Sequence, residues 1–211
     1  MEKTIIYLDF LDNYYYNVVV QHRAVDHLIE KETKMKTVGD QVTKFAVTGV
    51  NPGNDDFFTI TEESFAGKWK VVVYYPKDFT FVCPTEIVAY DRLFSDFADR
   101  DAVLLTGSTD NEFCKLAWQA AHEDLKKIKH IQFADTQRGE LSLIDQLGVF
   151  YAPAGAALRA TFIIDPDNVI QHVTVNNLNV GRSSEETLRI LDALQTGEKC
   201  ACNRAVGGET L

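Results

Sequence analysis

The sequence predicts an α/β fold in which helices flank a central mixed β-sheet. From Val38 onward, short apolar runs alternate with segments of amphipathic helical pattern, and this alternation is typical of a sheet covered by helices. Residues 159–175 instead predict two strands joined by the turn Asp165–Asn168, which together form a hairpin. Because a hairpin pairs its strands antiparallel, we expect the sheet to be mixed.

The individual elements follow from composition and from signals at their ends. Buried strands are predicted where apolar, β-branched residues cluster, at 70–75, 102–108 and 132–134. Amphipathic helices are predicted at 85–98, 111–124, 139–147 and 184–194. We expect Asp110 to cap the second helix, Gly148 to end the third, and Ser183 or Ser184 to open the fourth.

Composition narrows the class of protein. A chain of 211 residues forms one large domain or two small ones. The net charge of −10 comes without a basic stripe, which disfavours nucleic-acid binding. No run of about 18 apolar residues occurs, so no membrane span is expected. The four cysteines are too few for a secreted disulfide scaffold, and we expect a cytoplasmic location.

The chain divides into three parts. Residues 1–34 lack the basic start and clean apolar stretch of a signal peptide. They are either not native, with translation starting at Met35, or a genuine extension that is poorly ordered or partly helical around 17–31. Residues 35–196 form the expected domain. The tail 197–211 has little apolar content and is expected to be mobile.

The most informative segment surrounds Cys83, in YYPKDFTFVCPTEI at residues 74–87. Pro84 is tolerated only in the first turn of a helix, so Cys83 is expected where a buried strand becomes a helix. A helix N-terminus carries free N–H groups and partial positive charge, which favours the reactive thiolate. Thr80 adds a hydroxyl three residues earlier, and Pro76 would shape the loop. A buried structural cysteine is the alternative reading.

Longer stretches carry a specific resemblance. FTFVCPTE at 79–86 is joined by Trp69–Lys70, by Trp118 in LAWQAAH, by RATFIIDP at 159–166, and by EKCAC at 198–202. Over roughly Met35 to Thr210 the chain resembles the typical two-cysteine peroxiredoxins. It is most similar to the bacterial, actinobacterial-like alkyl hydroperoxide reductase C subgroup.

The resemblance implies a thioredoxin-like fold and a thiol peroxidase that reduces hydrogen peroxide and organic hydroperoxides. Cys83 matches the peroxidatic cysteine, whose thiolate would become a sulfenic acid. Thr80 and Arg159 would orient the peroxide, with Pro76 enclosing the pocket. Glu86 matches a residue that braces such an arginine. We expect Trp118 to pack in the core near the site rather than to take part in the chemistry.

The other cysteines divide into a tail pair and Cys114. Cys200 matches the resolving cysteine, which attacks the oxidised Cys83 of a partner subunit, and Cys202 is a possible second resolving thiol. A zinc site would want four ligands at Cys-x2-Cys-like spacing, so no metal is expected. Cys114 matches no motif and is expected to be structural, with a third redox thiol as the alternative.

The resemblance also implies partners and leaves alternatives. No cofactor is expected, because the sulfur does the redox work. An external dithiol would complete the cycle: a thioredoxin-like, flavoprotein or small Cys-x-x-Cys reductant. A homodimer assembling into a decameric or dodecameric ring is implied. The alternatives are a thiol–disulfide oxidoreductase, although Glu86 stands where its second cysteine would be, and an oligomeric holdase chaperone.

Overall fold

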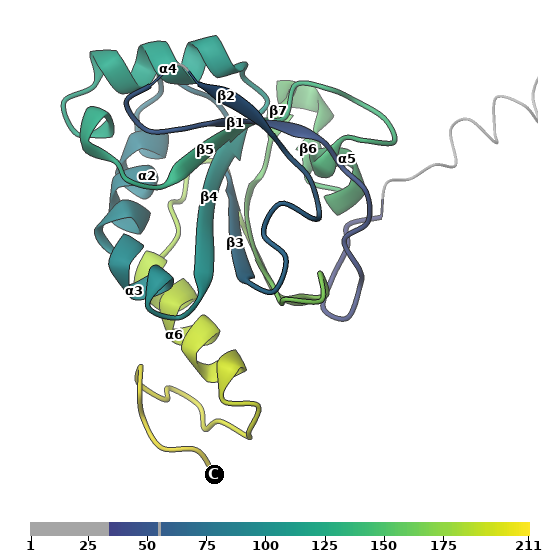
Figure 1. Ribbon diagram of the computed structural model, residues 1–211, viewed down its shortest axis with the longest axis vertical. Coiled ribbons are helices and arrows are strands. Elements are labelled where there is room, and N and C mark those ends of the chain that lie inside the picture. The colour runs from purple at the N-terminus through teal and green to yellow at the C-terminus, as the bar shows by residue number, and fades with distance from the viewer. Residues whose placement is uncertain (1–33, 55) are drawn as a thin grey trace, which may run out of the picture. The chain divides into compact units, whose positions relative to one another are not determined.

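The structure, a computed structural model, describes residues 34–54 and 56–211. The expectations for residues 1–33 lie outside the described residues. In the described part, seven strands form one sheet in the order β2-β1-β5-β4-β3-β8-β9, with helices on both faces (Figure 1). The strands are β1 (Val47–Val50), β2 (Phe57–Ile60), β3 (Trp69–Tyr74), β4 (Ala102–Ser108), β5 (Ile131–Ala134), β8 (Arg159–Ile164) and β9 (Ile170–Asn176), with a small separate pair, β6 (Phe150–Tyr151) and β7 (Ala156–Ala157). The helices are α2 (Val82–Arg92), α3 (Phe94–Ala98), α4 (Glu112–Ala121), α5 (Leu143–Leu147) and α6 (Ser184–Gln195), with short 3-10 turns at Leu125–Lys127 and Ala152–Ala154.

The sheet is mixed, as predicted. Its strand β3 runs parallel to β4, with Val71 opposite Leu104, and antiparallel to β8, with Val71 opposite Ile163. The predicted hairpin is β8–β9, in which Phe162 faces Val173. Strands β1 and β2, which the sequence pattern did not reveal, extend the sheet beyond β5.

Separate hydrophobic cores lie on the two faces of the sheet. Alternate residues of a strand point to opposite faces, so Val71 and Val73 pack with Tyr90 of α2 and Leu191 of α6. Val72 belongs to the other face, in the core that includes α5. Figure 1 shows α2 and α3 on one side of the strands and α5 on the other. Helix α2, which carries Cys83, is therefore seated against a fully buried surface.

The predicted helix 85–98 is two helices. It starts earlier, at Val82, because Pro84 fits within the first turn. It is interrupted at Leu93, whose backbone N–H donates to the carbonyl of Tyr90 at 3.0 Å. This three-residue bond tightens the end of α2, and α3 begins at Phe94.

The predicted helix 139–147 is only α5, five residues long. Gly139 has a φ of 102°, which is incompatible with a right-handed helix. The cap is Ser142, whose hydroxyl accepts from the Asp145 N–H at 3.2 Å. Gly148, in the left-handed conformation, ends the helix as expected.

The cap expected at Asp110 belongs instead to Asn111, which accepts from the Cys114 N–H at 2.8 Å. The carboxylate of Asp110 accepts from the Asp78 N–H at 2.7 Å, so it holds the loop before Cys83. The last helix, α6, is capped by Ser183, as one of the two predicted alternatives.

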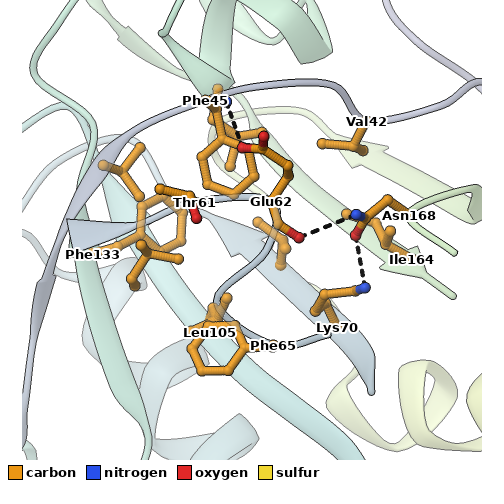
Figure 2. A pocket seen from close by; sticks show the side chains of 14 residues that line it. Val42, Phe45, Thr61, Glu62, Phe65, Lys70, Leu105, Phe133, Ile164 and Asn168 are labelled. Carbon is orange, nitrogen blue, oxygen red and sulfur yellow. Dashed lines mark hydrogen bonds between the residues drawn. The ribbon is translucent and has the colours of Figure 1, made fainter. Parts of the chain in front are cut away.

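An apolar pocket lies on the sheet face opposite α2 (Figure 2). At its rim, Lys70 Nζ donates to Asn168 Oδ1 at 2.8 Å, and Asn168 Nδ2 donates to the Glu62 carbonyl at 3.1 Å. The room inside for water-sized molecules is about 20 Å³, which matches roughly one water. It is a gap in packing rather than a site for a substrate.

Among the described helices, none is long and apolar enough to cross a membrane.

A buried carboxyl group, that of Asp135, links β3 to α5. Asp135 follows β5 directly and accepts from Tyr74 Oη at 2.7 Å and from the Ile144 N–H at 2.6 Å. Burial raises the pKa of Asp135 to about 6, although both hydrogen bonds oppose the rise. Because the pKa of an unfolded Asp is about 3.9, the folded protein binds this proton more tightly than the unfolded chain. The stability that this contributes is full below about pH 4 and is lost as the pH rises through about 6.

We predict that Asp135→Asn removes this pH dependence, because the amide oxygen still accepts both hydrogen bonds but carries no charge. Relative to the variant, the wild type should lose about 3 kcal/mol of unfolding free energy between pH 4 and pH 7. Urea unfolding at one protein concentration measures the difference. An unchanged difference across this range would show that Asp135 ionises freely in the folded state.

Candidate active site

Cys83 lies in the first turn of α2. Its side chain is buried, with the residue 1% exposed. Pro84 follows it in the same turn, where a missing N–H costs no helical hydrogen bond. The residue therefore lies at a helix N-terminus, which carries free N–H groups and a partial positive charge.

Arg159 brings a cation to the same sulfur. It begins β8, beside β3, and its Nη1 donates to Cys83 Sγ at 3.4 Å. The same nitrogen donates to Glu86 Oε2 at 2.6 Å, and Nε donates to the Leu178 carbonyl at 2.7 Å. These bonds fix the guanidinium plane, so the donor at the sulfur is held in place before any substrate arrives.

Glu86 is shared by two buried arginines. Besides Arg159, it accepts from Arg182 Nε at 2.8 Å and from the Arg182 backbone N–H at 3.0 Å. Arg182 also donates to the Ala160 carbonyl at 2.8 Å. Two guanidinium groups and one carboxylate leave one positive charge in excess beside Cys83, and a buried charge is costly unless it is paired. The cluster therefore favours a negative charge on a neighbouring group.

Arg182 was not found from the sequence. It lies between Gly181 and Ser183, just before α6. In the sequence it has no feature that distinguishes it from an ordinary polar residue of a loop. A faint signal was available, since an arginine just before a helix N-terminus meets an unfavourable dipole and needs an acid nearby.

Thr80 and Pro76 lie on the loop that precedes Cys83, and both are half-buried. The hydroxyl of Thr80 donates to the Lys77 carbonyl at 2.9 Å. Its oxygen therefore keeps lone pairs that can accept from an O–H group of a substrate. Between them, Phe79 has a φ of 54°, a left-handed conformation that is uncommon outside glycine.

Trp118 comes from α4 and packs beside the site. Its ring lies 6.1 Å from that of Tyr75 and 5.9 Å from that of Phe79, measured between centroids. It belongs to the same buried cluster as Cys83 and Ile87. This is the packing position that the sequence suggested.

The tail cysteines lie beyond α6. Cys200 is half-buried, and its Sγ is 3.7 Å from the Ala193 carbonyl and 3.6 Å from Thr196 Oγ1. Cys202 is exposed. All four cysteines are free thiols, and neither tail sulfur is bonded to Cys83.

Contacts with one acid hold the tail to its own α6. Arg204 Nη1 donates to Asp192 Oδ2 at 2.6 Å, and the Gly207 N–H donates to the same oxygen at 2.9 Å. The tail contains no helix or strand among its described residues.

Cys114 is half-buried on α4 and differs from Cys83 in its surroundings. Burial, together with the negative charges of Asp78 and Asp110, raises its pKa to about 11. At neutral pH the thiol is protonated, and the thiolate is the nucleophilic form. This supports a structural role.

A second constellation resembles a hydrolase triad but is sealed. Asp91 Oδ1 is 2.7 Å from His130 Nδ1, and His130 Nε2 is 3.0 Å from Thr106 Oγ1. Thr106 and His130 are fully buried, so no substrate reaches the hydroxyl. The chain of bonds ties α2 to β4 instead.

Residues 38–173 match the AhpC/TSA family. The chain belongs to the AhpC/TSA family. It is 46% identical over 185 residues to alkyl hydroperoxide reductase C of Mycolicibacterium smegmatis, which covers 83% of this chain and 93% of the relative.

Solved structures of family members show the same fold. Mycobacterium tuberculosis AhpC superposes with a TM-score of 0.72 at 43% identity, over 80% of this chain and 98% of that one. A reduced two-cysteine peroxiredoxin of Plasmodium vivax superposes with a TM-score of 0.75 at 35% identity, over 82% of this chain and 92% of that one. The predicted thioredoxin-like α/β fold and the family resemblance are confirmed.

We predict that Arg159→Met slows the reaction of Cys83 with hydrogen peroxide by roughly 10- to 100-fold, the effect of losing one charge-assisted hydrogen bond. Stopped-flow fluorescence gives the second-order rate. Arg92→Met, at the exposed end of α2, is the matched control and should react like the wild type. A rate for Arg159→Met within twofold of the wild type would contradict the role of this arginine.

Proposed function

We propose that this protein is a thiol peroxidase that reduces hydrogen peroxide and organic hydroperoxides at Cys83. The observation that carries the proposal is the guanidinium donor of Arg159, 3.4 Å from a sulfur in the first turn of a helix. The names of the relatives, alkyl hydroperoxide reductase and peroxiredoxin, support it.

In the first step, the Cys83 thiolate attacks one peroxide oxygen. A sulfur–oxygen bond forms as the O–O bond breaks, and the electron pair of that bond leaves with the second oxygen, which takes a proton to become water or an alcohol. Sulfur is oxidised to a sulfenic acid. Arg159 stabilises the charge that moves onto the oxygens, Thr80 accepts from the peroxide O–H, and Pro76 shields the loop from water.

In the second step, a tail thiol resolves the sulfenic acid. Its sulfur bonds to Cys83 Sγ, and the sulfenic oxygen leaves as water. We assign this role to Cys200, with Cys202 as a second thiol that takes over the disulfide by exchange. An external dithiol, from a thioredoxin-like protein, a flavoprotein or a small Cys-x-x-Cys partner, then restores both thiols. The cycle needs a reducing compartment, which supports the cytoplasm as its location.

The resolving thiol is assigned to a partner subunit in a homodimer. Strand β9 is an edge strand of the sheet that the described residues form, and its unpaired backbone groups can pair with those of a second copy. That pairing would bring the tail after α6 of one copy toward the other.

A second contact supports assembly into a decameric or dodecameric ring. Phe81 is 94% exposed, and Phe79 and Phe113 are also largely exposed. Phe79 and Phe81 line one surface hollow together with Trp118, and exposed aromatic side chains that lie together mark an interaction surface. In this proposal residues 35–196 form the peroxidase domain and residues 197–211 the resolving tail.

The geometry argues against a thiol–disulfide oxidoreductase. The position that would hold its second cysteine is Glu86, which is buried and bonded to Arg159 and Arg182. The site is built to hold an arginine beside one sulfur rather than to close a local disulfide.

We predict that peroxide treatment links two subunits through a Cys83–Cys200 disulfide. Non-reducing electrophoresis with mass mapping should show a covalent dimer in the wild type and in Cys114→Ser, and none in Cys83→Ser or Cys200→Ser. Cys83→Ser should also lose at least roughly 10³-fold in peroxide turnover, because the thiol beside Arg159 is the proposed nucleophile.

Undiminished peroxide consumption by Cys83→Ser would overturn the proposed function. A dimer that persists in Cys200→Ser but disappears in Cys202→Ser would move the resolving role to Cys202.

A further inference from the structure

A fully buried lysine lies beneath the loop that leads to Cys83. Lys115, on α4, has no exposed side-chain surface. Its ammonium donates to Ser108 Oγ at 2.7 Å, to Tyr75 Oη at 3.2 Å and to Asp78 Oδ1 at 3.2 Å. The side chain of Asp78 is only 1% exposed. This buried ion pair joins α4 to the loop.

Burial of the Lys115–Asp78 pair carries a large desolvation penalty. Burial lowers the pKa of Lys115, and the charges of Asp78 and Asp110 oppose the fall. Two charges removed from water lose hydration that their attraction only partly returns. Both charges regain that hydration if the loop moves away from α4, so the closed loop is held by contacts of modest net strength.

The same loop contains local strain. Phe79, which follows Asp78, has a φ of 54°, a conformation that costs a bulky residue energy and persists only when its surroundings hold it. The residue before Phe79 is held, because the Asp78 N–H donates to Asp110 at 2.7 Å, and the Phe79 ring packs against Trp118 of α4.

The resolving step needs this loop to open, an inference that rests on the proposed function. A disulfide requires two sulfurs about 2 Å apart, yet Cys83 is 1% exposed. No thiol of another chain reaches Sγ while the loop and the first turn of α2 stay closed. The closed loop and first turn, however, keep the sulfur beside Arg159 for the attack on peroxide.

We propose that the Lys115–Asp78 pair is the latch of the Cys83 loop, a pair of positioning residues that sets how long the oxidised cysteine stays closed. The closed state reacts with peroxide, and the open state reacts with the resolving thiol. A closed sulfenic acid that meets a second peroxide becomes a sulfinic acid as that peroxide is reduced. Weakening the latch therefore shifts the outcome from sulfinate toward disulfide.

The test compares Lys115→Met, Asp78→Asn and the double variant with the wild type. Methionine fills the space of the lysine chain without its charge and leaves Asp78 unpaired. The matched control is Lys126→Met, because Lys126 forms only an exposed pair with Glu123. Three kinds of quantity are measured. The first is amide hydrogen exchange of residues 77–83 in the reduced protein. The others are the rate constants of peroxide attack and of disulfide formation in stopped flow, and the sulfinate fraction by intact mass.

We expect each single variant to exchange these amides at least roughly tenfold faster, because breaking a buried pair is strongly destabilising. Disulfide formation should be faster, peroxide attack slower and the sulfinate fraction lower. The double variant should lie closer to the wild type than either single change, since it leaves no unpaired charge. Lys126→Met should match the wild type in all three.

Unchanged exchange at 77–83 and an unchanged ratio of the two rates in both single variants would overturn the latch. If Lys115→Met does not fold, Asp78→Asn and Lys115→Gln give the same readouts. The exchange measurement uses reduced protein without peroxide, so it separates failure of the latch from failure of the peroxidase function, which Cys83→Ser tests.

Discussion

The active site depends on the carboxylate of Glu86 between two buried arginines. Glu86 accepts from Arg159 at 2.6 Å and from Arg182 at 2.8 Å, and all three side chains are nearly inaccessible to water. One carboxylate cannot neutralise two guanidinium groups, so the cluster needs a further negative charge. Cys83 Sγ lies 3.4 Å from Arg159 Nη1, at the edge of this cluster. The fold thus places this sulfur beside a buried network that carries an excess of positive charge.

Two thiols of the same chain lie in opposite electrostatic surroundings. Cys83 lies at a helix N-terminus beside a guanidinium, whereas Cys114 lies near the carboxylates of Asp78 and Asp110. Of the two, only Cys83 has an arginine nitrogen within hydrogen-bonding distance of its sulfur. The sequence therefore identifies the cysteines that are candidate nucleophiles, but the charged groups around each sulfur distinguish between them.

Local signals in the sequence predicted much of this arrangement, and long-range pairings account for what was missed. Pro84 predicted the helix start at Cys83, and the apolar runs predicted the central strands. The pattern overextended α5, because the left-handed Gly139 and the cap at Ser142 act on single residues. Arg182 and Lys115 were missed because their partners, Glu86 and Asp78, are 96 and 37 residues away.

Burial serves the two halves of the proposed cycle in opposite ways. A dry, closed site strengthens the bond from Arg159 to Cys83 and orients the peroxide, but it also hides the sulfur from any second thiol. A loop held by apolar packing alone would gain nothing from water on opening. A loop held by a buried ion pair, with Phe79 in a strained conformation, regains hydration and relieves strain when it opens. The segment before Cys83 is therefore built to be closed firmly enough for chemistry and still to be released.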